Sequence, residues 1–424
     1  MDIQTDYPML VRSRSGHDYF YDTLSNRLTT RLDNEHSFAP IHYEVCDEYV
    51  FTRIGMFTIE ITQECNLRCS YCCYSGEYPN RRKHNSTVLS MENMELCVDF
   101  ICRHSAIEVP IIYVAFYGGE ALLYLDKIEW IIRELSRRSQ GRTYEFSIST
   151  NGTLLKPEII DEICSIENLF VTITIDGDKE YHDISRMTSS GNGTFDTIMS
   201  NLKDFKKRYP TAFRERVKFI STIKSIQDLI PLNDFWMSSD ILQKNRPQHI
   251  ASIIPNFNKG DTVSTDRIKF ERIYDKGIEY IRKGNQNILT DELFNLIKTV
   301  RRRVYTVEPD TLQLSTCINI PNSCFISSDG NLYVCERFCT QYKLGSLAEG
   351  FDENKCKELN QKYIHLKNKF CSKCWARRLC RRCAMNLNYT EKQFLQYCKN
   401  ERMQIELALK YYCEWKEFKH GFLF

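Results

Sequence analysis

The sequence predicts an α/β protein whose main part is a partial (β/α)6 barrel. Six apolar, strand-like runs are each followed by a helical segment, at residues 57–62, 111–116, 144–150, 170–175, 217–223 and 249–254. The polar segments that can carry chemistry come directly after these runs. In a barrel of parallel strands, ligands gather at the carboxyl ends of the strands.

Composition narrows the class further. The chain of 424 residues can form a barrel-sized domain and a smaller attached one. Its 57 basic and 55 acidic residues nearly cancel, which is unlike a nucleic-acid binder. Without a long apolar stretch or a signal-like N-terminus, we expect a cytoplasmic protein with neither a membrane nor a nucleic-acid partner. The 19 cysteines favour metal ligation over disulfides.

Helical periodicity identifies cysteines that belong to the core. Ser90 is a good N-cap for a helix in which Met94, Cys97, Val98 and Ile101 recur at helical spacing. We therefore expect Cys97 to be a core residue. The same interpretation applies to Cys102 and Cys164.

A first group of cysteines, Cys65, Cys69 and Cys72, follows the first predicted strand in the segment Cys-Asn-Leu-Arg-Cys-Ser-Tyr-Cys. Three thiolates at this spacing supply three ligands where an iron-sulfur cluster normally has four. One iron is then open for contact with a cofactor or substrate. A zinc loop or a chance grouping in a Cys-rich chain is the alternative.

This CxxxCxxC pattern, with Tyr71 before its last cysteine, resembles the radical S-adenosylmethionine (SAM) superfamily. The resemblance implies a TIM-like barrel in which Cys65, Cys69 and Cys72 hold a [4Fe-4S] cluster. It also implies that the open iron binds the amino and carboxylate groups of SAM, and that Tyr71 lies against the adenine. The reduced cluster would pass one electron to SAM, releasing methionine and a 5′-deoxyadenosyl radical that abstracts hydrogen.

Gly118, Gly119 and Glu120 end the second strand and resemble the family's motif for the SAM amino group. Two glycines let the backbone approach an ammonium group, and Glu120 offers a carboxylate to pair with it. The family's usual proline is Ala121 in this chain.

The next two strands also end in polar groups. Ser149 and Asn151 offer a hydroxyl and an amide of the kind that bind ribose hydroxyls or a carboxylate, with an ordinary turn as the alternative. Asp176 ends the fourth strand, and Arg186 resembles the family arginine that pairs with the methionine carboxylate. A surface salt bridge is the alternative for Arg186. We expect His182 to be structural.

A second group of cysteines occupies the last quarter of the chain: Cys317, Cys324, Cys335, Cys371, Cys374, Cys380, Cys383 and Cys398. Twelve residues separate Cys317 from Gly330, and four separate Gly330 from Cys335. This spacing, with the CxxC pair that follows, resembles a SPASM domain, which carries two auxiliary [4Fe-4S] clusters. The chain would then hold three clusters.

The interleaved ligation of that domain implies a nearer cluster at Cys317, Cys324, Cys335 and Cys383, and a farther one at Cys371, Cys374, Cys380 and Cys398. The family usually has three residues between the cysteines that match Cys380 and Cys383, whereas this chain has two. Cys339 or Cys413 can substitute if that assignment fails. A pair of structural zinc sites is the alternative for the whole segment.

The N-terminal region alternates like a β-hairpin around Ser25 and Asn26, without a catalytic grouping, and suggests a docking element. We therefore predict three parts. Residues 1–55 form a small β-rich element that can dock a leader peptide, residues 56–305 form the radical SAM barrel, and residues 306–424 form the SPASM domain.

The hairpin, residues 74–78 with Arg82 and His84, and residues 335–337 resemble the radical SAM/SPASM maturases of ribosomally synthesised peptides. The resemblance implies a precursor peptide with a leader as substrate, modified by a thioether or carbon-carbon cross-link or a similar change. It also implies an external one-electron donor of the flavodoxin or ferredoxin type.

Two other functions stay open. Anaerobic sulfatase-maturing enzymes share this architecture but typically have Asp after the cysteine that matches Cys335, where this chain has Glu336. Glu336 is a candidate catalytic base for the oxidation of a substrate radical, with a surface salt bridge as its alternative. A zinc-binding nucleic-acid module would explain the paired cysteines but neither the three-cysteine loop nor the motifs at the strand ends.

Overall fold

The computed structural model describes residues 9–31, 40–45, 48–78, 80–106, 108–139, 141–242, 245–253, 259–305, 311–314, 316–319, 321–337, 340–380, 383 and 387–420. The chain forms two compact units. The first, called unit 1, contains residues 1–46, 260–315 and 360–424, and the second, called unit 2, contains residues 47–259 and 316–359.

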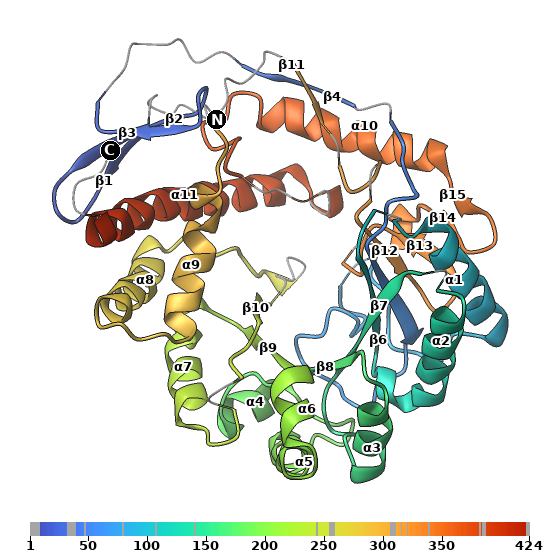
Figure 1. The fold of residues 1–424 in the computed structure, drawn as a ribbon. Coiled ribbons are helices and arrows are strands. Elements are labelled where there is room, and N and C mark those ends of the chain that lie inside the picture. The colour runs from blue at the N-terminus through green and yellow to red at the C-terminus, as the bar shows by residue number, and fades with distance from the viewer. Residues whose placement is uncertain are drawn as a thin grey trace. The chain divides into compact units, whose positions relative to one another are not determined.

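Unit 2 is built on one sheet with the strand order β10-β9-β8-β7-β6-β5-β12-β13-β14-β15 (Figure 1). Neighbouring strands from β10 to β12 run parallel, and β13, β14 and β15 add antiparallel pairs. The strands are β5 Met56–Thr62, β6 Ile111–Gly118, β7 Thr143–Thr150, β8 Leu169–Thr174, β9 Val217–Ile223, β10 His249–Ser252, β12 Ser323–Ile326, β13 Asn331–Tyr333, β14 Gly345–Ser346 and β15 Gly350–Phe351.

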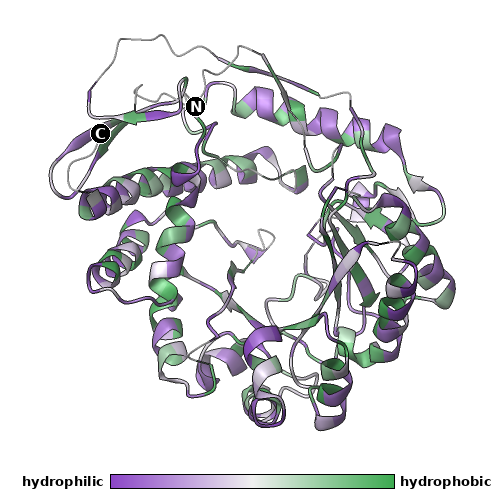
Figure 2. Ribbon diagram, viewed as in Figure 1, coloured by the Kyte–Doolittle hydropathy of each residue, from purple (hydrophilic) through white to green (hydrophobic). Residues whose placement is uncertain are grey.

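Helices cover one face of this sheet: α1 Met91–His104, η1 Ala121–Tyr124, α2 Leu125–Arg137, α3 Pro157–Ser165, α4 Lys179–Ser185, α5 Phe195–Arg208, α6 Pro210–Arg216, η2 Ile226–Asp228 and α7 Leu229–Ser238. Alternate strand residues point toward them, as where Phe57 of β5 meets Phe100 of α1 with ring centroids 6.4 Å apart. Figure 2 shows the resulting pattern, with apolar strands and helices that mix apolar and polar residues.

The predicted barrel is confirmed at the level of fold class, since the six predicted runs coincide with β5 to β10 to within a few residues. The predicted cap is also present, because the Ser90 side chain accepts a hydrogen bond from Asn93 N (3.1 Å) at the start of α1. Cys97 is fully buried on α1, as expected.

Unit 1 contains an antiparallel sheet, a parallel strand pair and helices. Its elements are β1 Met9–Arg12, β2 Asp18–Asp22, β3 Arg27–Thr29, β4 His42–Val45, β11 Thr311–Leu314, α8 Arg267–Arg282, α9 Ile288–Arg301 and α11 Glu391–His420. Helix α10, Glu353–Phe370, begins in unit 2 and ends in unit 1, and η4, Thr340–Tyr342, belongs to unit 2. The predicted hairpin is present as β2 and β3, with Asn26 at a φ of 57° in its turn.

The two units cut across the predicted boundaries. Residues 260–305, predicted to belong to the barrel, group with the N-terminal sheet and α11, whereas residues 316–359 of the predicted SPASM domain extend the barrel sheet. The physical reason is strand pairing, because β12 lies parallel to β5, with Cys324 opposite Phe57.

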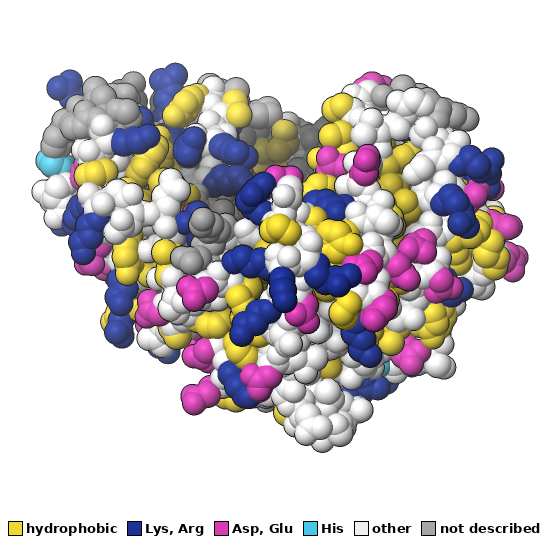
Figure 3. Space-filling model, turned by 60° about the horizontal axis from the view of Figure 1, so that its bottom comes forward, with side chains coloured by type: hydrophobic (Ala, Val, Ile, Leu, Met, Phe, Trp, Pro, Cys, Tyr) yellow, Lys and Arg dark blue, Asp and Glu magenta, His cyan; other side chains and the backbone are white. Residues whose placement is uncertain are grey.

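The surface in Figure 3 mixes Lys and Arg side chains with Asp and Glu side chains, in line with the balanced composition. In the described part of the chain, no helix combines the length and the apolar character needed to span a membrane.

Candidate active site

The cysteines of the first group lie on an irregular loop that leaves the carboxyl end of β5. Arg68 N donates a hydrogen bond to Met187 O (2.7 Å), and Ser70 N donates to Ser185 O (2.9 Å). The end of α4 and the residues after it therefore hold this cluster loop, residues 63–75, in place.

The thiols of Cys65, Cys69 and Cys72 are half-buried and lie within electrostatic reach of one another. Burial raises the pKa of Cys65 to about 11 and that of Cys72 to about 12, and neighbouring thiols add to both effects. Metal binding must therefore displace protons from these thiols. Across the described residues, no three His, Cys, Asp or Glu side chains converge tightly enough to hold a single metal ion. Three thiols on one loop are the donor set of a cluster with an open iron.

Gly118 and Gly119 let β6 end directly against the cluster loop. A Cβ on Gly118 would lie 2.2 Å from Thr62 O, and one on Gly119 would lie 2.1 Å from Glu64 O. The predicted close approach of the backbone is thus present, but in this structure Gly118 approaches the end of β5 and Gly119 approaches the start of the cluster loop. The glycines are needed for this contact whether or not they also face a ligand.

Glu120 is buried and joins the ends of β6 and β7. Its carboxylate accepts hydrogen bonds from the Thr150 hydroxyl (2.8 Å), Asn151 N (2.7 Å) and Leu122 N (3.1 Å). Burial raises the pKa of Glu120, and these donors oppose that effect. A carboxylate offers about four acceptor directions, so one remains for the predicted ammonium contact.

Asn151 holds the cluster loop through Asn66. Its Nδ2 donates to Asn66 Oδ1 (2.8 Å), and Asn66 Nδ2 donates to Thr153 Oγ1 (2.8 Å). Asn151 therefore positions the cluster loop, a role that the sequence did not indicate. Its predicted contact with a ribose or a carboxylate stays a prediction. Ser149 is half-buried on β7. For Asn66, its place inside the cysteine motif is the only signal in the sequence.

Tyr71 of the cluster loop is half-buried and forms one network with the buried side chains of Asp176 and Arg186. The Tyr71 hydroxyl donates to Asp176 Oδ2 (2.5 Å) and accepts from Arg186 Nη1 (2.8 Å). Burial alone would lower the pKa of Arg186, but Tyr71 and Asp176 outweigh it and raise that pKa. Arg186 Nε is buried without a hydrogen-bond partner among the described residues. A ligand carboxylate would satisfy such a donor, so Arg186 fits its predicted contact with SAM.

His84 contacts the cluster loop from the segment that follows it. Its Nε2 lies 3.4 Å from Cys72 Sγ, and its Nδ1 lies 3.3 Å from Gln63 O. Burial lowers the pKa of His84 and favours the neutral ring. The sequence named His84 only through the resemblance to peptide maturases, because its distance from Cys72 along the chain carries no signal of contact.

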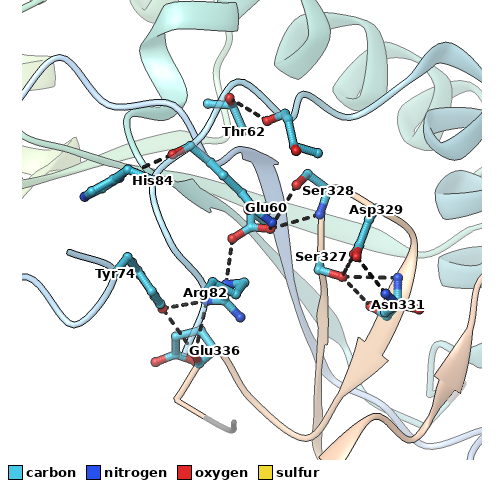
Figure 4. A network of polar contacts seen from close by, with 12 residues as sticks. Glu60, Thr62, Tyr74, Arg82, His84, Ser327, Ser328, Asp329, Asn331 and Glu336 are labelled. Carbon is cyan, nitrogen blue, oxygen red and sulfur yellow. Dashed lines mark hydrogen bonds and ion pairs between the residues drawn. The ribbon is translucent and has the colours of Figure 1, made fainter. Parts of the chain in front are cut away.

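Glu336 follows Cys335 on the segment after β13 (Figure 4). Its backbone oxygen accepts hydrogen bonds from the Tyr74 hydroxyl (3.1 Å) and from Arg82 Nη2 (3.1 Å). The side chain is 31% exposed, and its Oε1 lies 3.6 Å from Arg337 Nε. Burial raises the pKa of Tyr117, at the end of β6, and negative charge on Glu336 and on Cys72 raises it further. The candidate base and the cluster loop therefore lie at the same end of the sheet.

Cys324 is buried on the helix-covered face of the sheet. It lies opposite Phe57 in the register of β12 and β5, within electrostatic reach of Cys97 on α1. Burial raises the pKa of the Cys324 thiol strongly. This placement speaks against the predicted ligand role of Cys324, because the thiol takes part in core packing. Cys317 and Cys335 are half-buried.

The cysteines predicted for the farther cluster all belong to unit 1. Cys371 and Cys398 are buried in one apolar cluster with Tyr43 of β4 and Phe394 of α11. Cys374 N donates to Cys371 O (3.0 Å), and Cys380 N donates to Ala376 O (2.8 Å), so Cys371 to Cys380 form a chain of tight turns. These contacts bring the loop and Cys398 together in one unit.

The remaining candidate cysteines differ in their exposure to solvent. Cys383 is exposed, and the residues on both sides of it lie outside the described ones. Cys339 also lies outside the described residues. Cys413 is fully buried on α11, which leaves the suggestion that it replaces a ligand without support.

Comparison with known proteins identifies the class. Residues 59–223 match the family model of the Radical SAM superfamily, and this segment contains the three cysteines and every strand-end motif described above. The chain therefore carries a radical SAM domain and is an enzyme, and the cofactors of that class are SAM and a [4Fe-4S] cluster.

Relatives with a known activity are similar over most of the chain. The cysteine-type anaerobic sulfatase-maturating enzyme of Clostridium perfringens (strain 13) is 23% identical over 84% of this chain and 92% of its own. The solved structure of native anSMEcpe with bound AdoMet and the Cp18Cys peptide covers 83% of this chain and 98% of its own, with a TM-score of 0.60 and 18% identity. Streptococcus suis SuiB bound to its precursor peptide SuiA covers 78% of this chain and 76% of its own, with a TM-score of 0.47 and 14% identity.

Proposed function

We propose that this enzyme uses a SAM-derived radical to abstract hydrogen from a residue of a peptide or protein. The observation that carries the proposal is the unpartnered Nε of Arg186 beside a loop with three half-buried thiols. An orphaned donor next to such a loop is suited to the carboxylate of SAM. The related C. perfringens protein is named for maturing a sulfatase, which is itself a protein substrate.

Each group has a proposed task. Cys65, Cys69 and Cys72 hold the [4Fe-4S] cluster, which together with SAM supplies one electron and a 5′-deoxyadenosyl radical. Arg186 binds the SAM carboxylate, Tyr71 lies against the adenine, and Glu120 with the Gly118–Gly119 backbone faces the amino group. Ser149, Asn151 and Asp176 are the remaining polar groups proposed to contact SAM. The protein's contribution is placement, because the radical itself is unselective.

Glu336 is the proposed base. Its carboxylate takes the proton that leaves the substrate when a substrate radical is oxidised. Two auxiliary [4Fe-4S] clusters are proposed to accept the electron or bind a substrate thiolate. The farther one uses Cys371, Cys374, Cys380 and Cys398. The nearer one uses Cys317, Cys335 and Cys383, while Cys324 is the predicted ligand that its burial argues against.

The preferred substrate is a ribosomally made precursor peptide that is modified by a cross-link or a similar change. Support comes from the sheet of β1, β2 and β3, which lies outside the radical SAM match and offers a docking element for a leader peptide. An external flavodoxin or ferredoxin is the proposed electron donor.

Sulfatase maturation, the formation of formylglycine, is the second candidate. The likeness to the cysteine-type sulfatase-maturating enzyme over 84% of this chain favours it. Glu336 in place of the usual Asp favours the precursor peptide instead.

The first test is SAM cleavage by the reconstituted enzyme. We expect the wild type to release 5′-deoxyadenosine when given SAM and dithionite. Changing Cys65, Cys69 and Cys72 together to Ala should abolish this release without unfolding the chain, whereas Cys164→Ala should not change it. Continued 5′-deoxyadenosine release by the triple variant would refute the assignment. Mass spectrometry then distinguishes the substrates, with a short peptide encoded beside the gene and a cysteine-containing sulfatase peptide as the two probes.

A further inference from the structure

A buried ion pair connects β5 to the segment after the cluster loop (Figure 4). Arg82 Nε lies 2.8 Å from Glu60 Oε1, and the two side chains are 6% and 3% exposed. The N–H does not point along this contact, so charge attraction rather than a hydrogen bond joins these two atoms. Neither residue was assigned to cofactor binding or catalysis above.

Glu60 is also held by other donors. Its Oε2 accepts from Ser328 N and from the Ser328 hydroxyl, both at 3.0 Å, and from Gln63 Nε2 at 3.1 Å. Ser328 belongs to the turn between β12 and β13. Glu60 therefore links β5 to the turn that leads toward Cys335.

The Arg82 guanidinium contacts two aromatic rings and two hydrogen-bond acceptors. Its guanidinium lies 4.6 Å from the centroid of the Tyr74 ring and 4.2 Å from that of Phe325. Nη2 donates to the Tyr74 hydroxyl (2.6 Å) and to Glu336 O (3.1 Å). The Tyr74 hydroxyl also donates to Glu336 O. The backbone oxygen of Glu336 therefore accepts from both Arg82 and Tyr74, and these two side chains are hydrogen-bonded to each other.

Residues next to Arg82 also bond to the segment that follows β13. Thr340 N donates to Asn80 O (3.0 Å), and Arg81 Nη1 donates to Arg337 O. The segment after the cluster loop is thus bonded at several points to the segment that carries Cys335 and Glu336.

Stability alone does not account for this arrangement. A buried ion pair contributes little net stability compared with apolar residues of the same size, because both charges lose their hydration. The pair instead fixes the orientation of the Arg82 guanidinium. A planar guanidinium with several donors then fixes the positions of the groups that it contacts. The groups that the guanidinium fixes here are the Tyr74 hydroxyl and the backbone oxygen of Glu336.

We propose that Arg82, oriented by Glu60 and Tyr74, is a positioning residue that holds the backbone of Glu336 so that its carboxylate faces the substrate. This inference rests on the proposed function, because it takes Glu336 as the group that serves the substrate radical. It adds a positioning role for Arg82, Glu60 and Tyr74, which the proposed function does not include.

The test compares two Arg→Lys variants of the full chain. Arg82→Lys keeps a charge opposite Glu60 but loses the fork that also reaches Glu336. Arg216→Lys is the control, because Arg216 also donates to backbone carbonyls, those of Ile166 (2.5 Å) and Cys164 (3.2 Å), and lies on α6. Tyr74→Phe removes a single hydroxyl and replaces Arg82→Lys if that variant does not fold.

The first readout needs no ligand. Amide hydrogen exchange of residues 331–337 should be about tenfold faster in Arg82→Lys and unchanged in Arg216→Lys. The second uses SAM and dithionite, for which 5′-deoxyadenosine release should stay within about twofold of wild type. With a peptide that the wild type modifies, product per 5′-deoxyadenosine should fall at least about fivefold in Arg82→Lys alone.

Unchanged exchange in Arg82→Lys overturns the proposal. So does a loss of SAM cleavage as large as the loss of product, because Arg82 would then support the cluster loop rather than Glu336. If the wild type releases no 5′-deoxyadenosine, the proposed function fails, and the exchange measurement still decides whether Arg82 orders the Glu336 segment.

Discussion

At the residue scale, His182 illustrates how burial separates a structural histidine from a catalytic one. Its Nδ1 accepts a hydrogen bond from Asp176 N (3.3 Å), and its Nε2 lies 3.2 Å from Thr194 Oγ1. Burial, aided by the charge of Arg186, lowers the pKa of His182 to about 3. The ring is therefore neutral at physiological pH and holds the end of β8 to the segment that follows α4.

This burial makes the unfolding free energy depend on pH. An unfolded histidine titrates at about 6.5, so between pH 6.5 and about 3 the unfolded chain binds a proton that the folded chain rejects. Stability should fall with decreasing pH in this window, by up to about 1.4 kcal/mol per pH unit. We expect His182→Gln to reduce this slope in melting curves between pH 7 and 5.

The control is His42→Gln, which changes an exposed histidine and should leave the slope unchanged. Parallel pH curves for wild type and His182→Gln would mean that His182 does not contribute to the loss of stability in acid.

At the element scale, the sheet of β1, β2 and β3 has two different faces. Tyr19 and Tyr21 are fully buried, and the Tyr19 hydroxyl donates to Glu417 Oε1 (2.5 Å) on α11. Leu10 and Phe20 pair across β1 and β2 on the opposite face, and Leu10 is 48% exposed. An apolar pair in which Leu10 is exposed and Phe20 is half-buried, on a well-anchored sheet, is a suitable contact for the proposed leader peptide.

Changing this face should affect peptide binding alone. We expect Leu10→Glu with Phe20→Glu to weaken binding of a labelled precursor peptide about tenfold, by removing apolar contact area, while SAM cleavage without peptide is unchanged. Ile268→Glu with Val304→Glu is the matched control, because it places two carboxylates at other exposed apolar positions of unit 1. Equal affinities for the Leu10→Glu/Phe20→Glu variant and the wild type would place leader binding elsewhere.

At the scale of the whole molecule, long-range pairing divides the chain into its two units. Residues 316–359 of the predicted SPASM domain belong to unit 2, where β12 to β15 extend the barrel sheet, and the cysteines of the farther cluster belong to unit 1. The predicted auxiliary ligands therefore fall in both units, and each has to be tested separately.

Metal content of the full chain tests them. Anaerobic reconstitution should give about twelve irons with matching sulfide for three cubanes. Cys324→Ala should keep that content, because its thiol packs beside Cys97, whereas Cys374→Ser should lose about four irons. A loss of about four irons in Cys324→Ala would restore Cys324 as a ligand, and zinc in place of iron would make the C-terminal sites structural.

Much of the barrel could be read from the sequence because its signals are local. The alternation in β7 and the capping of α1 by Ser90 depend on residues a few positions apart, and so does the spacing of Cys65, Cys69 and Cys72. Arg186 was predicted from its place after the fourth strand and its likeness to the family arginine, whereas its hydrogen bond to the Tyr71 hydroxyl, 115 residues away, was not predicted.

The sequence by itself thus determined the β-α order, the three-cysteine loop and the polar groups at the strand ends. Only the tertiary structure decided that Cys324 faces Cys97, that Gly119 packs on Glu64 O, and that Arg82 reaches Glu336. The physical reason is distance along the chain. Arg82 and Glu336 are 254 residues apart, and they meet because β12 pairs with β5, a long-range contact that no local spacing encodes.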